Sequence, residues 1–142
     1  MIIKHIAVIG AGFMGSGIAQ VASQAGYEVD LVDLDGPLLD KSRMGIERSL
    51  VKLHDKGMLT ESPTLILGRI KMGTALGAAE PADIVIESVF EDIDVKLGIM
   101  AQLNTLCRRS TIIGSNTSTI PITELSEAVT ERDRVVGTHF FG

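Results

Sequence analysis

Hydrophobic positions along the chain occur in short runs, separated by longer segments with the spacing of an amphipathic helix. The runs are rich in β-branched residues and predict strands at residues 3–9, 28–32, 69–73, 81–87, 111–114 and 134–138. The segments between them predict helices at residues 12–25, 36–56, 60–68, 94–106 and 121–128. Strands that alternate with helices are typical of a parallel sheet with helical crossovers. The pattern therefore predicts an α/β fold, with one domain over residues 1–142 and a doubly wound, mostly parallel sheet that carries helices on both faces.

The first predicted strand runs directly into a Gly-x-Gly-x-x-Gly turn, and a helical pattern begins at once. Gly10 permits a tight turn, Gly12 leaves room for a pyrophosphate beside the backbone, and Gly15 lets the helix lie close to the sheet. The start of the helix offers free N–H groups and a partial positive charge to phosphates. We therefore expect a Rossmann-type fold whose turn, with Phe13 and Met14 included, binds a dinucleotide.

Asp33 directly follows the second predicted strand and lies 18 residues after Gly15. This is close to the spacing of about 20 residues expected for an acid that holds the adenosine ribose. A carboxylate there accepts hydrogen bonds from both ribose hydroxyls and repels a 2′-phosphate. Residues 34–40 contain no basic side chain that would favour such a phosphate. The predicted cofactor is therefore NAD rather than NADP. The alternative for Asp33 is a solvated acid at a strand end.

The composition is that of an ordinary soluble protein, with 45% hydrophobic and 22% charged residues. The net charge of −5 and the pI near 5.1 favour neither nucleic acid nor an anionic membrane as a partner. No apolar run approaches the length of a membrane span, and we expect no signal peptide before the first strand. The single cysteine, Cys107, excludes an intramolecular disulfide and fits a reducing compartment. We expect a protein without a metal site that is cytoplasmic, or mitochondrial if a targeting segment has been removed.

Ligands of an open α/β sheet bind beyond the carboxyl ends of the strands, so the residues just past each strand are the candidates for chemistry. Glu91 and Lys96 flank the loop after the fourth strand, as ligands or as an ordinary solvated ion pair at a helix start. Residues 115–119 form a run of hydroxyl and amide side chains after the fifth strand. This run offers hydrogen-bond donors to a ligand. The alternative, strongest for Thr119, is a helix N-cap before Pro121.

Of the three histidines, only His139 lies at the carboxyl end of a predicted strand. Imidazole has an unperturbed pKa of about 6.5, so it can take the proton of an alcohol that is being oxidised near neutral pH. His139 is therefore the candidate base of a dehydrogenase. His5 lies within the first strand, where a structural role is the better interpretation. His54 lies on the long polar helix, where we expect it to be solvated.

Four motifs, in order along the chain, carry a family resemblance. They lie at residues 8–20 (VIGAGFMGSGIAQ), 86–92 (IESVFED), 115–118 (SNTS) and 139–141 (HFF). Over its whole length the sequence resembles the L-3-hydroxyacyl-CoA dehydrogenases, and most of all the bacterial 3-hydroxybutyryl-CoA type. The resemblance implies NAD-dependent oxidation of an L-3-hydroxyacyl-CoA to a 3-oxoacyl-CoA, in fatty-acid or butanoate metabolism.

The resemblance also implies roles for individual residues that match family positions. The pyrophosphate and the adenosine ribose would be held by Gly10, Gly12, Gly15 and Asp33. The nicotinamide half of NAD would be contacted by Glu91, Lys96 and Ser118. The acyl-CoA substrate would be contacted by Ser118, Ser49 and Lys56. His139 would be the catalytic base that removes the proton of the 3-hydroxyl group.

Two departures from the family limit what this chain is expected to do. The family motif continues His-Phe-Phe-Asn-Pro, whereas Gly142 stands at the position of the asparagine, which contacts the cofactor in the family. The family also pairs its histidine with a downstream glutamate and adds a C-terminal helical dimerisation domain, and we expect both to be absent here. A base without its orienting carboxylate loses rate by orders of magnitude. The chain is therefore expected to be a cofactor-binding half with little or no activity alone, and a homo-oligomer in its full-length form.

Two other functions stay open from the residues. One is a different hydroxyacid dehydrogenase on the same scaffold, such as one that oxidises a free sugar acid, and binding of CoA would separate it from the acyl-CoA enzyme. The other is a noncatalytic NAD-binding module. A full-length protein without a glutamate downstream of His139 would favour that module.

Overall fold

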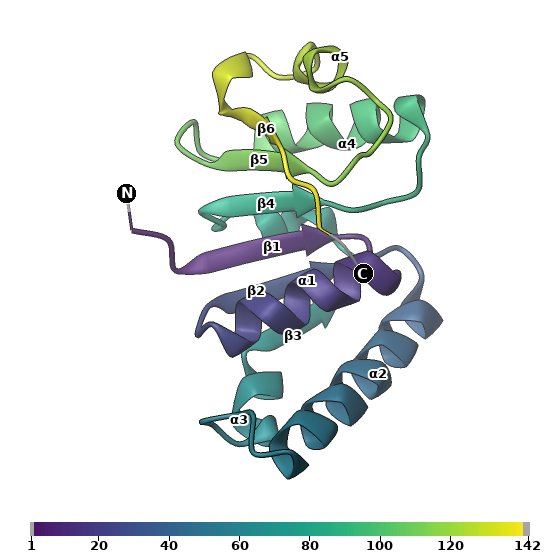
Figure 1. Cartoon of the computed structure of the whole chain (residues 1–142). Helices are drawn as coiled ribbons and strands as arrows, with labels where there is room; N and C mark the ends of the chain where they lie inside the picture. Colours follow the sequence, from purple (N-terminus) through teal and green to yellow (C-terminus); the bar gives the residue numbers. More distant parts are fainter. Residues whose placement is uncertain (1, 141–142) are drawn as a thin grey trace.

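The computed structural model describes residues 2–140 and contains one six-stranded sheet (Figure 1). Its strands are β1 (His5–Ile9), β2 (Glu28–Val32), β3 (Ile70–Gly73), β4 (Ile84–Glu87), β5 (Ile112–Ser115) and β6 (Val135–Gly137). The order across the sheet is β3-β2-β1-β4-β5-β6, and all five pairings are parallel. A parallel sheet with this order is the Rossmann-type fold, which confirms the predicted fold class.

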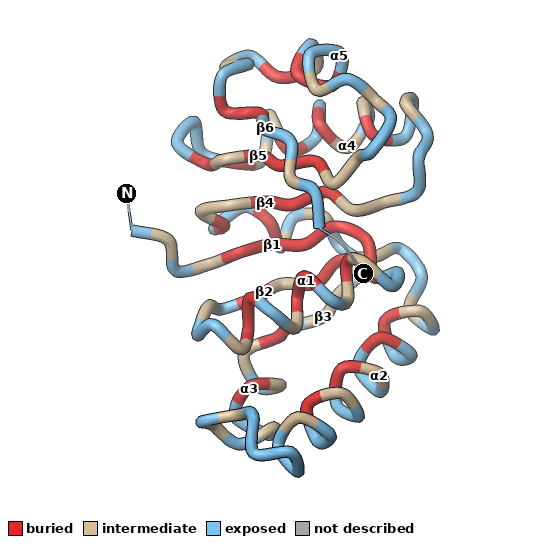
Figure 2. Tube along the Cα trace, viewed as in Figure 1, coloured by how far each residue is buried: buried red, intermediate tan, exposed pale blue. Residues whose placement is uncertain are grey.

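Helices cover both faces of the sheet. They are α1 (Phe13–Gln24), α2 (Gly36–Asp55), α3 (Pro63–Gly68), α4 (Ile93–Leu106) and α5 (Ile122–Ser126), with 3₁₀ turns η1 (Leu76–Ala79) and η2 (Arg132–Arg134). One apolar core includes residues of α1, α2 and α3, and a second includes residues of α4, α5 and η1. Figure 2 shows the buried residues in the strands and along one side of the helices.

The central strand β1 shows why the strands are continuous apolar runs. Ile6 and Val8 belong to the core that α1 covers, whereas Ala7 and Ile9 belong to the core that α4 covers. All four side chains are buried. Because successive side chains of a strand point to opposite faces, a strand that is covered on both faces needs an apolar residue at every position.

Local capping residues explain where the helices begin and end. The side chains of Asp35, Ser62 and Asp92 accept hydrogen bonds from backbone N–H groups in the first turns of α2, α3 and α4. Pro37 lies in the first turn of α2, where its missing N–H costs nothing. The residue after the C-cap of α2 is Gly57, with a φ of +71° that favours glycine.

The predicted elements are present, with differences at their ends. The fourth strand begins at Ile84 rather than at residue 81, because Asp83 lies in the turn before it and accepts hydrogen bonds from two backbone N–H groups near the N-terminus. The last helix is shorter than predicted, with Pro121 as its N-cap. The turns η1 and η2 were not predicted, since segments of three or four residues leave no periodic signal.

Two interpretations of the histidines are confirmed. Nε2 of His5 lies 2.5 Å from Oδ2 of Asp30, on the neighbouring strand, and 18% of each side chain is exposed. His5 therefore has a structural partner. It is the first residue of β1, at the end of the strand opposite to the carboxyl end. His54 is exposed on α2, as expected for a solvated residue.

None of the helices within residues 2–140 combines the length and the hydropathy that crossing a membrane requires. In the same part of the chain, no group of three or more histidine, cysteine, aspartate and glutamate side chains is arranged to hold a metal ion. The expected cytoplasmic location stays a prediction.

The substitution Gly15→Ala tests how closely α1 must approach the glycine turn. A Cβ at residue 15 would lie 1.7 Å from the carbonyl oxygen of Gly10, so the helix or the turn would have to shift. We expect the free energy of unfolding, measured by urea denaturation, to fall by at least about 2 kcal/mol.

Gly17→Ala, in the same helix, is the matched control. A Cβ at residue 17 would meet nothing within 4 Å, so stability should be unchanged or should rise by ~0.5 kcal/mol. Equal stabilities of the two variants would contradict the close approach at Gly15.

Candidate functional site

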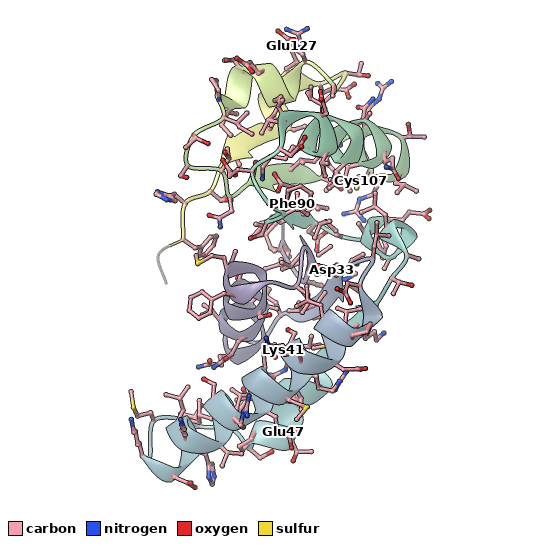
Figure 3. All side chains as sticks on the ribbon, turned by 90° about the vertical axis from the view of Figure 1, so that its right-hand side faces the viewer. Asp33, Lys41, Glu47, Phe90, Cys107 and Glu127 are labelled. Atoms are coloured by element: carbon pink, nitrogen blue, oxygen red, sulfur yellow. The ribbon has the colours of Figure 1, made fainter. Side chains whose placement is uncertain are left out.

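The carboxyl ends of the strands lie at one edge of the sheet, on the right-hand side of Figure 1. The chain builds β2 and β3 on one side of β1, whereas β4, β5 and β6 extend the sheet on the other side. Between β1 and β4 the order reverses, and ligands of open α/β sheets bind in the crevice outside such a reversal. Figure 3 looks onto this edge, with Asp33 and Phe90 labelled near its centre.

The glycine turn has the geometry that a pyrophosphate requires. Gly10 has a φ of +109°, and a Cβ there would lie 2.5 Å from the carbonyl oxygen of Ser88. Beside Gly12 a Cβ would meet nothing within 4 Å, so the backbone is open to a close approach. Gly12 is also the N-cap of α1, and no described side chain caps that helix. The first N–H groups of α1 are therefore available to phosphate oxygens.

Asp33 follows β2, and two backbone groups hold its carboxylate in place. The N–H of Ala11 donates to Oδ2 at 2.8 Å, and the N–H of Asp35 donates to Oδ1 at 3.0 Å. Each carboxylate oxygen can accept more than one hydrogen bond. The carboxylate thus joins the glycine turn to the end of β2 and keeps acceptor capacity on both oxygens for two ribose hydroxyls.

A cleft of about 550 Å³ opens beside Asp33. Gly10 and Gly12 line it at the glycine turn, and its other lining residues are mainly apolar, among them Leu34, Leu76, Val89, Phe90, Val95 and Ile99. No lysine, arginine or histidine is among the described residues that line the cleft. The cleft therefore suits an adenine ring and an unphosphorylated ribose, as NAD requires.

Lys96 is fully buried in α4 beneath this edge. Its Nζ donates to Oε2 of Glu87 at 2.6 Å and to the carbonyl oxygen of Val89 at 3.1 Å, and it lies 3.2 Å from Oε1 of Glu91. Glu87 is itself fully buried at the end of β4, and it accepts a further hydrogen bond from Oγ of Ser115 at 2.5 Å. Buried charges persist in proteins when they are paired and hydrogen-bonded, and these contacts meet that condition.

Glu91 links the loop after β4 to the loop after β5. Its Oε2 accepts hydrogen bonds from Oγ1 of Thr117 at 2.7 Å and from Oγ1 of Thr119 at 2.6 Å. Burial by itself would raise the pKa of Glu91. The hydrogen bonds from Thr119, Thr117 and Lys96, with the charge of the lysine, outweigh burial and lower the pKa to about 2. The carboxylate is therefore ionised at neutral pH.

These contacts show that two alternatives suggested by the sequence are wrong. Glu91 and Lys96 are not a solvated pair, because the lysine side chain has no exposed surface. Thr119 is not a helix N-cap, because its hydroxyl donates to Glu91 and Pro121 is the N-cap of α5. Ser118 is exposed between the two threonines. Direct contact of these residues with NAD stays a prediction.

His139 follows β6 and is exposed. Its chain segment is tied to the loop after β5 by two hydrogen bonds. The N–H of Thr138 donates to the carbonyl oxygen of Ser115 at 2.9 Å, and the N–H of Phe140 donates to Oδ1 of Asn116 at 3.0 Å. The backbone on both sides of the histidine is therefore held at the same edge as Glu91. The catalytic role of His139 stays a prediction.

A second hollow, of about 600 Å³, lies between α1 and α2. Ser49 lines it and accepts a hydrogen bond from Nε2 of Gln20 at 2.9 Å. Lys56 is exposed at the C-terminal end of α2 and is not among the lining residues. Aromatic, charged and apolar side chains contribute to the lining, among them Phe13, Met14, Lys41, Arg48 and Phe140.

The sequence did not indicate the structural roles of two residues at this edge. Glu87 ends the otherwise apolar strand β4, and an acid in a buried strand is a signal that it has a partner. Asn116 holds the segment after β6, but nothing in a run of polar residues shows which member does so. Phe141 and Gly142, which end the sequence, lie outside the described residues.

Comparisons with known proteins agree with this geometry. The sequence matches the family described as 3-hydroxyacyl-CoA dehydrogenase, NAD binding domain, over residues 5–142. A probable 3-hydroxybutyryl-CoA dehydrogenase of Deinococcus radiodurans is 44% identical over 133 residues, which cover 94% of this chain and 48% of that protein. The mitochondrial hydroxyacyl-coenzyme A dehydrogenase of Sus scrofa is 40% identical over 149 residues, which cover 99% of this chain and 47% of that protein.

A solved structure gives the same result for the fold. The crystal structure of 3-hydroxybutyryl-CoA dehydrogenase from Escherichia coli is similar with a TM-score of 0.96 and 37% identity, covering 100% of this chain and 30% of that one. This chain spans about half the length of the curated relatives it matches. The predicted cofactor, NAD, is confirmed by the match to an NAD-binding family. The chain therefore belongs to the 3-hydroxyacyl-CoA dehydrogenase family, whose NAD-binding domain it carries.

Proposed function

We propose that this chain is the cofactor-binding half of an NAD-dependent 3-hydroxyacyl-CoA dehydrogenase and that it supplies the catalytic base, His139. The observation that carries the proposal is the presence of three features at one sheet edge. They are the open glycine turn, the anchored carboxylate of Asp33 and a histidine directly after β6. The names of the relatives support the same class of reaction.

The residues at this edge fit NAD on both sides of the glycine turn. The start of α1 holds the pyrophosphate, and Asp33 holds the adenosine ribose beside the apolar cleft. Glu91 and Ser118 hold the other half of the cofactor above β4 and β5. When bound, NAD accepts the hydrogen and the electron pair that leave C3 of the substrate.

His139 removes the proton of the 3-hydroxyl group through a neutral ring nitrogen, while the C3–O bond becomes a carbonyl. The hydrogen bonds on either side of it hold the backbone in place before substrate arrives. The orienting glutamate that the family resemblance implies would belong to the other half of the protein. The chain alone is therefore proposed to bind cofactor with little or no turnover, and the full-length form to be homo-oligomeric.

The hollow between α1 and α2 suits an acyl-CoA, because CoA carries phosphates beside an apolar chain. Lys41 and Arg48 bring positive charge to this hollow, and Ser49 adds a hydroxyl group. Phe140 also lines it, next in sequence to His139, so the hollow extends toward the proposed base. Lys56 extends the basic face of α2 at its exposed end. A role in fatty-acid or butanoate metabolism is part of this proposal.

Asp33→Ala tests the cofactor assignment. Loss of the carboxylate removes the hydrogen bonds to the ribose, so we expect the affinity for NADH to fall about tenfold or more. The measurement is a fluorescence titration of NADH into the 142-residue chain. Asp40→Ala, which removes an exposed acid from α2, is the control and should leave the affinity unchanged. No saturable NADH signal from the unaltered chain, or a preference for NADPH, would contradict the assignment of NAD as the cofactor.

Arg48→Ala tests the proposed CoA site. We expect the affinity for CoA, measured by isothermal titration calorimetry, to fall about fivefold or more, because one charge-assisted hydrogen bond is lost. Arg43→Ala is the matched control, since Arg43 is on the same helix and lines a different hollow. Absence of CoA binding, or an equal effect of both variants, would favour a dehydrogenase for another hydroxyacid.

His139→Ala tests the base. In a full-length dehydrogenase that contains this chain, we expect kcat for acetoacetyl-CoA reduction by NADH to fall at least about a hundredfold, with the Kd for NADH nearly unchanged. Stopped-flow and binding measurements separate the two quantities. A wild-type kcat in this variant would show that another residue is the base.

A further inference from the structure

Two carboxylates and one ammonium form a charge cluster at the end of β4. Lys96 pairs with Glu87 at 2.6 Å inside the protein and with Glu91 at 3.2 Å toward the surface. The fully buried pair cancels its own charge. The cluster therefore keeps one net negative charge, and it lies on Glu91, whose side chain is 39% exposed.

In this structure the charge of Lys96 is directed at acceptors of the protein itself. None of its side chain is exposed, and the acceptors around Nζ are Glu87, Glu91 and the carbonyl oxygen of Val89. An ammonium group has three protons to donate, so these acceptors satisfy it. The lysine holds the loop after β4 and the carboxylate of Glu91 in position.

Glu91 lies on the side of the edge that we propose for the nicotinamide half of NAD. Asp33 takes the adenosine ribose at the end of β2, so the second nucleoside of the dinucleotide lies on the opposite side of the glycine turn. Thr117 and Thr119, of the loop after β5, both donate to Glu91. These bonds place the carboxylate above β4 and β5.

The part of the sequence that contains Glu91 has an excess of acidic side chains. Residues 74–130 contain eight acidic side chains and three basic ones. The basic residues other than Lys96 are Arg108 and Arg109, which follow the C-terminal end of α4. Arg108 pairs with Asp83 at the start of β4, at the opposite edge of the sheet.

An oxidised nicotinamide ring carries a positive charge that the reduced ring lacks. A fixed negative charge beside the ring therefore stabilises the oxidised form relative to the reduced form. We infer that Glu91 biases this site toward NAD⁺ over NADH. The inference rests on the proposed placement of the nicotinamide beside Glu91. A bias of this kind also shifts the equilibrium between bound reactants toward the hydroxyacyl compound and NAD⁺.

The test is the ratio of two dissociation constants, Kd for NAD⁺ divided by Kd for NADH, measured by calorimetry on the 142-residue chain at low ionic strength. Glu91→Gln keeps an acceptor for the threonine hydroxyls and loses the charge, so the ratio should rise about three- to thirtyfold. Glu91→Asp keeps the charge, so its ratio should stay within about twofold of the wild type even where both affinities fall.

Glu127→Gln is the matched control, because it removes the same charge from an exposed residue after α5, which Figure 3 shows at the top of the molecule, apart from Phe90 and Asp33. Its ratio should equal that of the wild type. A residue with a merely structural role would weaken both ligands equally. An unchanged ratio in Glu91→Gln, with both ligands still bound, overturns the inference and leaves the proposed function intact. Failure of the unaltered chain to bind either ligand overturns both.

Discussion

The close approach of α1 to the end of β1 is the contact on which the rest of the site depends. A side chain at Gly15 would collide with the carbonyl of Gly10, so the helix can start where it does only with glycine there. That start directs the first N–H groups of α1 toward the crevice. It also places the N–H of Ala11 against the carboxylate of Asp33, so one turn sets both positions that we propose for the phosphate and the ribose.

The buried Lys96 fixes the positions of groups on the other side of the crevice. A buried ion pair is weak evidence for stability, because removing two charges from water costs about what their attraction returns. The contribution of this ion pair is to hold neighbouring groups in position. Lys96 gathers the end of β4, the loop that follows and the carboxylate of Glu91, and Glu91 then holds the hydroxyls of the loop after β5.

Basic and acidic side chains are concentrated in different parts of the molecule, which the net charge of −5 does not show. The helix α2 presents Lys41 and Arg48 to the hollow that it shares with α1. The segment after β4 is acidic, with Glu91 ionised at neutral pH because the threonine hydroxyls and Lys96 lower its pKa to about 2. The proposed phosphate-binding hollow is therefore basic, whereas the proposed nicotinamide side is acidic.

The sequence by itself determined the order of strands and helices, the glycine turn, and the places of Asp33 and His139 after strands. These features depend on periodicity and spacing along a short stretch of chain, which the residues display directly. The sequence did not reveal that Lys96 is buried on Glu87, or that Thr119 binds Glu91 instead of capping a helix. Those partners lie on different elements, so only the packing of α4 and the loop after β5 against the sheet decided them.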